Sequence, residues 1–209
     1  NNKPSPENLR YHNSSTLSDP NGNRGEFYRK SYLLAFGEYI PFGETFPVLY
    51  SIIPQIGRFI PGEEQNLITY FKNKTEVTFG KSHLKWVDSS FMNMQAHRDY
   101  YKENISEVES AGKFLPLICY EVLLPEFVRK FYKTEMPDFI VNITNDKWYG
   151  KTVESYEHLE LARLRSIEFR RWMVRSTNSG TSAFVDHLGR IVNNTMTDLG
   201  TSEYYSSRV

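Results

Sequence analysis

The single cysteine of this chain, Cys119, stands where a thiol could act as a nucleophile. The apolar run 114–118 predicts a buried strand, polar residues follow the thiol, and a helix-like stretch begins near Pro125. A nucleophile on a sharp turn between strand and helix is exposed at the sheet edge, and the next backbone N–H is free to stabilise an oxyanion. A lone cysteine is more often a small buried hydrophobe, so other residues must decide between the two interpretations.

Three ionisable side chains are candidate partners of the thiol. Lys30 lies at the exit of a predicted hairpin, Glu38 eight positions further on, and Glu121 two positions past Cys119. A thiol must lose its proton before it attacks a carbonyl, and nearby positive charge favours the thiolate. A fixed ammonium can also hold the oxyanion of a tetrahedral intermediate, and a neighbouring carboxylate keeps a buried ammonium charged. These residue types therefore suit nucleophilic attack by Cys119 on a carbonyl group.

Each of these residues also has a purely structural interpretation. Lys30 could be a solvated lysine at a strand end, and Glu38 could cap the turn that follows it. Glu121 could be the acidic first-turn residue of the helix after the cysteine, where the helix dipole favours negative charge. Asn142 and Asn145 bracket a predicted strand end and could be turn residues.

Composition and spacing argue against several classes of function. No histidine lies beside Cys119, and the five histidines show no metal-ligand spacing, so neither a cysteine–histidine dyad nor a zinc site is supported. We expect no metal and no cofactor. Lys and Arg number 25, as do Asp and Glu, and this balance gives no support to a nucleic-acid partner held by a basic field. The 14 Tyr and 14 Phe suit large packed or apolar-ligand surfaces.

The length and the start of the chain bear on its organisation. The 209 residues fit one large domain or two small ones. No stretch approaches the ~20 apolar residues that span a bilayer. The first residues, 1–4, contain neither an initiator Met nor an apolar signal region. We therefore expect a fragment of a longer protein.

The segments that would position these groups can be predicted from turn signals and hydrophobic periodicity. The string Asp19-Pro20-Asn21-Gly22 predicts a hairpin that ends near Lys30. The 36–62 segment predicts an irregular, aromatic-lined loop with one short helix at 48–53. Beyond it, the predicted strands are 114–118, 139–143, 172–177, 181–186 and 190–195, and the predicted helices are 125–133 and 154–171. Alternating strands and helices favour a layered α/β domain.

The helix predicted at 154–171 is amphipathic, which predicts which of its side chains are buried. Its apolar stripe consists of Leu159, Ala162, Leu164 and Ile167. We expect Glu160 and either Arg163 or Arg165 to face outward.

Six strings, taken together, resemble the nitrilase (carbon–nitrogen hydrolase) superfamily and, within it, the apolipoprotein N-acyltransferase family. They occur in family order and span nearly all of the chain. They are Tyr28-Arg29-Lys30, the 34–41 string around Phe36-Gly37-Glu38-Tyr39, Ile118-Cys119-Tyr120-Glu121, the 145–150 string Asn-Asp-Lys-Trp-Tyr-Gly, 158–165 and 175–180. Any one of them is weak, but their combination separates this branch from the soluble nitrilases.

The resemblance implies an α/β fold of the nitrilase-like αββα type, a four-layer sandwich here truncated at its N-terminal side. It implies a Glu–Lys–Cys triad, in which Lys30 matches the lysine and Cys119 the nucleophile. Glu38 matches a supporting glutamate, while Tyr120 and Glu121 match residues that flank the nucleophile and support the oxyanion. Candidate contacts to an apolar substrate are Trp148, Tyr149 and Phe36.

Three departures from the family pattern accompany this resemblance. The triad glutamate, the general base, should lie upstream of Lys30, but none of the upstream acids has the expected setting; these are Glu7, Asp19 and Glu26. The transmembrane segments of the family are also missing, and we expect the fragment alone to be inactive. We interpret 1–209 as one nitrilase-like domain of a longer membrane protein, with 64–112 as an inserted arm or lid.

The resemblance implies an acyltransferase. It would move a fatty acyl chain from a phospholipid, through a thioester on Cys119, to the N-terminal amine of a diacylglyceryl-cysteine lipoprotein. The implied location is the bacterial inner membrane, with this domain on the periplasmic side. Two alternatives remain open: a soluble nitrilase-type amidase with water as the acceptor, and a catalytically incomplete binding domain.

Overall fold

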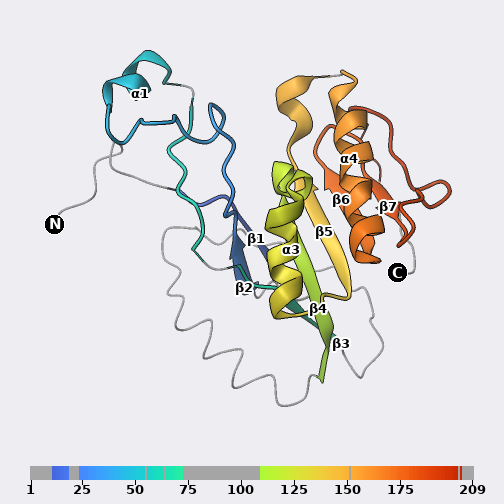
Figure 1. The fold of residues 1–209 in the computed structure, drawn as a ribbon. Helices are drawn as coiled ribbons and strands as arrows, with labels where there is room; N and C mark the ends of the chain where they lie inside the picture. The colour runs from blue at the N-terminus through green and yellow to red at the C-terminus, as the bar shows by residue number, and fades with distance from the viewer. Residues whose placement is uncertain are drawn as a thin grey trace.

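In the computed structural model, two β-sheets and the helices beside them organise the described part of the chain (Figure 1). The described residues are 11–18, 24–54, 56–63, 65–72, 109–150, 152–201 and 203. The strands are β1 (Ser14–Ser18), β2 (Arg24–Arg29), β3 (Ile68–Lys72), β4 (Glu109–Ile118), β5 (Phe139–Thr144), β6 (Trp172–Thr177) and β7 (Ala183–Val185). The α-helices are α1 (Val48–Ile52), α3 (Pro125–Thr134) and α4 (Glu154–Phe169), and η4 (Cys119–Leu123) and η5 (Asp146–Tyr149) are short 3-10 helices.

The larger sheet has the strand order β3-β4-β5-β6-β7. Its three central strands are parallel to one another, and β3 and β7 run antiparallel at the edges. Helix α3 connects β4 to β5, and α4 connects β5 to β6. Successive right-handed crossovers in one direction put both helices on the same face of a sheet, and Figure 1 shows α3 and α4 lying across one face. This arrangement confirms the predicted α/β class.

The strand register explains where the core lies and how polar groups enter it. One row across the central strands is Leu115–Ile140–Met173, and its members pack into a core shared with both helices. The next row toward the strand ends is Leu117–Asn142–Arg175. Side chains two positions apart on a strand share a face, so the second row brings an amide and a guanidinium into the interior, next to the turn at Cys119.

The smaller sheet is the antiparallel hairpin of β1 and β2, which the sequence predicts. It contacts β3 and β4, so that the exit of β2 lies beside the larger sheet (Figure 1). Tyr28 of β2 is fully buried, and its ring lies 6.3 Å from that of Phe131 in α3. The hairpin thus carries Lys30 to the end of β4 rather than into solvent.

The helices begin where local chemistry favours it. Pro125 opens α3, where its missing N–H would have no intrahelical partner in any case. Two glutamates in the first turn of α4, Glu154 and Glu157, suit the positive end of the helix dipole. The chain leaves α4 through Arg170, whose φ of 54° is left-handed, and enters β6 two residues later.

The predicted buried face of α4 is only partly correct. Leu159 and Ala162 are buried as predicted, but Leu164 and Ile167 are 46% and 40% exposed. Arg165 is buried instead, and its Nη2 lies 3.3 Å from Glu168. The actual inner face follows the 3.6-residue spacing from Ser155 through His158, Leu159, Ala162 and Arg165 to Ser166. Buried polar side chains therefore replace part of the expected apolar stripe.

The segment predicted as an arm or lid, 64–112, is described only at its ends. Residues 68–72 form β3, which pairs antiparallel with β4 from Glu109 onward. Its central part, 73–108, lies outside the described residues, so the prediction of an arm remains a prediction. The strand predicted at 190–195 is wrong, because Ile191 forms only an isolated bridge with Val185. In the described part of the chain, no helix combines the length and apolar character needed to cross a bilayer.

Candidate active site

Cys119 lies at the abrupt change from strand to helix that the sequence predicts. Strand β4 ends at Ile118, and η4 begins with the cysteine itself. The φ angle of Cys119 is 56°, in the left-handed region that residues with a Cβ seldom occupy. The thiol is partly exposed. Strained backbone at a candidate nucleophile persists only where surrounding contacts hold it, and those contacts come from two directions.

The first set of contacts is made by Glu121, which is fully buried. Its Oε1 accepts hydrogen bonds from the backbone N–H groups of Ser31 and Tyr32, at 2.8 and 3.0 Å. Its Oε2 accepts from the backbone N–H of Ile118 at 2.8 Å and from the hydroxyl of Tyr28 at 2.9 Å. The carboxylate therefore joins the end of β2 to the residue just before the cysteine, and we call this group the Glu121 clamp.

The pKa shifts of Glu121 and Tyr28 agree with Tyr28 as a donor and Glu121 as an acceptor in the Glu121 clamp. Burial raises the pKa of Glu121, although all four hydrogen bonds oppose this effect. Burial and the adjacent carboxylate raise the pKa of Tyr28, so its hydroxyl stays protonated and can donate. With every oxygen of Glu121 engaged by donors, the carboxylate holds structure together and is not free to move a proton. Glu121 does lie in the first turn of a helix, η4, as its structural interpretation predicts. That interpretation does not include the hydrogen bonds from Tyr28, Ser31 and Tyr32.

Lys30 and Glu38 form the pair that the sequence predicts. Lys30 is only 1% exposed, and its Nζ donates to Oε2 of Glu38 at 2.6 Å. The same Oε2 accepts from the backbone N–H of Leu34 at 2.8 Å, while Oε1 accepts from Asn13 Nδ2 at 2.8 Å. The interpretation of Lys30 as a solvated strand-end lysine is therefore wrong. Because Lys30 precedes Ser31 in the chain, the Glu121 clamp holds the ammonium-bearing segment against the turn that carries Cys119.

A buried polar cluster makes the second set of contacts with the turn. Asn142 Nδ2 donates to the carbonyls of Leu117 and Cys119, at 3.2 and 3.3 Å. The Oδ1 of Asn142 accepts from Nη1 of Arg175, and Nη2 of Arg175 donates to Asp146 Oδ2 at 3.0 Å. Asn142 is thus a buried strand residue, and its interpretation as a turn residue is wrong. Asn145 does lie in a turn, where its side chain caps η5 by accepting from Lys147 N–H.

Asp146 balances the buried positive charge of Arg175. Burial alone would raise the pKa of Asp146, but the hydrogen bond from His158 and the charge of Arg175 outweigh it and lower that pKa. Burial lowers the pKa of Arg175, and Asp146 and then Cys119 act against this effect. The hydroxyl of Thr144 also donates a hydrogen bond to Asp146 Oδ1, at 2.9 Å. The cluster is therefore an ion pair with a full set of partners, placed directly behind the nucleophile turn.

Two of the three predicted substrate contacts, Trp148 and Phe36, lie on exposed surface. Trp148 is 69% exposed. Phe36 is 65% exposed and is held with a φ of 61° by a turn in which its N–H donates to the carbonyl of Tyr39. The side chain of Tyr149 lies outside what the structure describes. Other exposed apolar residues of the same loop are Phe42, Phe46, Val48 and Ile52.

The general base implied by the resemblance has no counterpart among the described residues upstream of Lys30. Glu26 is the one acid there, and it is exposed on β2. Glu7 and Asp19 lie outside the described residues. In the part of the chain that the structure describes, no group of three or more His, Cys, Asp or Glu side chains could hold a metal ion.

Sequence reasoning missed Asn13, Asp146 and Arg175 as members of the site. The last two occur in strings that carry the resemblance, but nothing in those strings marks them as partners of each other. Asn13 lies 25 positions from Glu38, and Arg175 lies 29 positions from Asp146. Only the fold brings such pairs together. The signal that remains in the sequence is the presence of polar residues inside predicted buried strands, which require hydrogen-bond partners.

Removing one carboxylate oxygen from the Glu121 clamp should destabilise the protein. In Glu121→Gln the amide NH₂ faces either Ile118 N–H or the two N–H groups of the β2 exit, so a buried donor loses its acceptor. We expect the free energy of unfolding to fall by about 2–4 kcal/mol. Tyr28→Phe removes a single donor and should lower it by about 1 kcal/mol. Urea denaturation of the full-length variants measures both, and equal values for wild type and Glu121→Gln would contradict the role of the clamp.

The sequence of this chain matches one family model and is similar to proteins of known name. The family model described as carbon-nitrogen hydrolase matches residues 2–203. A protein of Leptospira interrogans named apolipoprotein N-acyltransferase 2 is 54% identical over 99% of this chain and 35% of its own length. The apolipoprotein N-acyltransferase of Bdellovibrio bacteriovorus is 36% identical over 83% of this chain and 25% of its own length.

The chain therefore spans about a third or less of the length of these relatives. Among solved structures, a mutant of an amidase from Nesterenkonia AN1 is similar over 91% of this chain and 52% of that chain. Its TM-score is 0.49 and its sequence identity is 15%.

Proposed function

Because the chain belongs to the carbon–nitrogen hydrolase family, we propose that it supplies the cysteine, lysine and supporting glutamate of a lipoprotein N-acyltransferase. The observation that carries the proposal is the Glu121 clamp, which binds the segment of the buried Lys30–Glu38 pair to the turn of a partly exposed Cys119. The names of the relatives support the choice of acyl transfer to a lipoprotein.

The family match and the mixed α/β architecture also confirm the predicted nitrilase-like fold. In this family setting, the described residues would provide the nucleophile turn, the ammonium of Lys30 and the Glu38 carboxylate that pairs with it. The upstream general base would be an acid in a part of the longer protein that this chain does not span. We therefore expect the 209-residue chain alone to be inactive.

In the proposed first half-reaction, the base takes the thiol proton and the Cys119 sulfur attacks the ester carbonyl of a phospholipid. The carbonyl oxygen becomes an oxyanion that the Lys30 ammonium and the Tyr120 backbone N–H stabilise. Collapse of the tetrahedral intermediate breaks the ester C–O bond and leaves a thioester on Cys119. The departing oxygen takes the proton from the base and leaves as a lysophospholipid.

In the proposed second half-reaction, the free amine of a diacylglyceryl-modified N-terminal cysteine attacks the thioester carbonyl. The C–S bond breaks, the acyl chain becomes an amide, and the amine proton returns to the thiolate through the base. The exposed aromatic residues Trp148 and Phe36, with Tyr149, would contact the acyl chain at a membrane surface. The proposed setting is the periplasmic side of the bacterial inner membrane, with 64–112 as an arm near the site.

The experiment that tests this function follows one labelled acyl chain. The full-length protein is incubated with vesicles of phosphatidylethanolamine labelled in the sn-1 acyl chain. We expect an acyl adduct on the peptide containing Cys119, release of the lysophospholipid, and transfer of label to a diacylglyceryl-cysteine lipopeptide. An N-acetylated lipopeptide is the matched control, because it lacks the amine and should leave the label on the enzyme.

Two results would overturn the proposal. Hydrolysis of small amides such as butyramide, with no label taken from phospholipid, would favour the soluble amidase that uses water as the acceptor. A folded full-length protein that forms no adduct with either class of compound would favour the binding domain.

A further inference from the structure

The peptide between Cys119 and Tyr120 is anchored from inside the protein through its carbonyl oxygen. That oxygen accepts a hydrogen bond from Asn142 Nδ2 at 3.3 Å. A trans peptide is planar, and its C=O and N–H point in opposite directions. Drawing the oxygen toward Asn142 therefore turns the N–H of Tyr120 away from Asn142. That N–H belongs to the first turn of η4.

The amide of Asn142 can play this part in only one of its two orientations. Its NH₂ must face the carbonyls of Leu117 and Cys119, and its oxygen must face the other way. Arg175 selects this orientation because Nη1 donates to Asn142 Oδ1. A guanidinium has donors only, so the flipped amide would place NH₂ against N–H and lose both sets of bonds.

Arg175 is itself fixed on its remaining sides. Its Nη2 binds Asp146 at 3.0 Å and its Nε binds the carbonyl of Thr181 at 3.3 Å. The side chain is 2% exposed, so water cannot replace these partners. The planar fork of Arg bridges Asn142 and Asp146 at the same time, which the single ammonium of Lys does less well.

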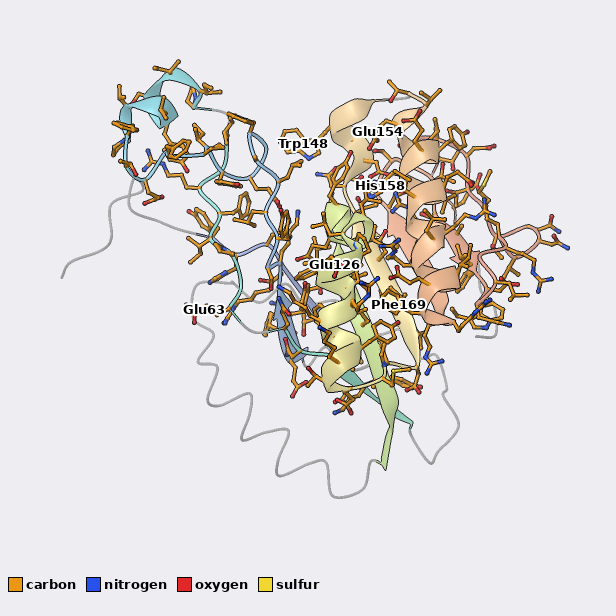
Figure 2. All side chains as sticks on the ribbon, viewed as in Figure 1. Glu63, Glu126, Trp148, Glu154, His158 and Phe169 are labelled. Carbon is orange, nitrogen blue, oxygen red and sulfur yellow. The ribbon has the colours of Figure 1, made fainter. Side chains whose placement is uncertain are left out.

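The same cluster holds the side chain of Tyr120. Asp146 Oδ1 pairs with Nδ1 of His158 at 3.2 Å, and the His158 ring stacks on the Tyr120 ring at 4.7 Å between centroids. The Tyr120 hydroxyl donates to Glu154, one helical turn before His158 at the start of α4 (Figure 2). The peptide is therefore constrained at its carbonyl and at the side chain of the residue that follows.

We propose that Asn142 and Arg175 are positioning residues that aim the Tyr120 N–H at the oxyanion formed when Cys119 is acylated. The inference rests on the proposed function and extends it, because it names groups buried behind the turn that set the geometry of the reaction. It also accounts for the left-handed φ of Cys119, since backbone of this kind needs contacts that fix it.

The test compares two reactions of the same thiol in the full-length protein. Acylation by p-nitrophenyl hexanoate passes through a tetrahedral oxyanion, whereas alkylation by iodoacetamide is a direct displacement that forms none. Asn142→Asp keeps the acceptor for Arg175 but puts an oxygen against the two carbonyls. We expect acylation to slow by about 10²-fold while alkylation stays within about threefold of wild type.

A second variant and matched controls keep the test decisive. Arg175→Lys retains the charge beside Asp146 but loses the fork, and we expect acylation to slow by about tenfold with alkylation unchanged. Asn193→Asp and Arg129→Lys make the same chemical changes at exposed positions and should behave as wild type.

Three results would count against the inference. Acylation at the wild-type rate in both test variants would overturn it, as would an equal loss of acylation and alkylation, which would indicate only a structural role. A wild-type protein that alkylates but takes no acyl group from the ester would overturn both this inference and the proposed function. The first of these results, with normal acylation of the wild type, would overturn the inference alone.

Discussion

Cys119→Ala in the full-length protein should abolish acyl transfer, with a loss of about 10⁴-fold or more. The thiol is the only group at the turn that can form a covalent intermediate by the proposed route, and its left-handed backbone places it at the end of β4. Cys119→Ser keeps a hydroxyl in the same place but lacks the intrinsic nucleophilicity of a thiolate, so it should form no acyl-enzyme. Intact-mass spectrometry after exposure to labelled phospholipid measures the adduct, and hydroxylamine should release it from wild type.

The stability of these variants separates chemistry from folding. Cys119 is partly exposed, so Cys119→Ser should change the free energy of unfolding by less than about 1 kcal/mol. The Glu121 clamp and the Asn142 hydrogen bonds do not involve the sulfur and should persist. An acyl adduct that persists on Cys119→Ser at the wild-type rate would show that another residue is the nucleophile.

The parts of the site that follow from short stretches of sequence could be predicted from it. The turn at Cys119 was marked by an apolar run that stops at the thiol, and β6 has the predicted bounds 172–177 because a charged helix and a polar turn flank it. The Lys30–Glu38 pair spans only eight positions and could be inferred from charge and context. Local pattern is enough where the partners are close in the chain.

The parts that depend on burial could not be predicted in this way. Glu121 was expected as a support for the oxyanion, but its four donors come from positions 3 to 93 residues away. Either Arg163 or Arg165 is expected to face outward because charge on a helix usually does, and the structure buries Arg165 beside Glu168. A single sequence does not show which polar side chains find partners inside, and these are the residues that hold the nucleophile turn.

Separating the catalytic and the structural effects of Lys30 requires a cycle of variants. In Lys30→Met the Glu38 carboxylate keeps its bonds to Leu34 and Asn13 but loses its cation. We expect acyl transfer to fall by about 10³-fold through loss of an oxyanion donor. The free energy of unfolding should fall by about 3 kcal/mol because a poorly solvated carboxylate is left unpaired. Lys113→Met is the matched control, since Lys113 and Glu135 pair at 2.7 Å but are exposed, and it should change stability by less than about 1 kcal/mol.

The double variant Lys30→Met/Glu38→Gln removes both charges and decides between the two roles. Glutamine can keep an oxygen toward Leu34 N–H, and Asn13 can flip its amide to accept from the new NH₂. Stability should therefore recover most of the loss seen in Lys30→Met, as urea denaturation would show. Acyl transfer should not recover, because neither methionine nor glutamine carries a positive charge to the oxyanion. Recovery of activity together with stability would mean that Lys30 only neutralises Glu38, and the ammonium would then have no part in the chemistry at Cys119.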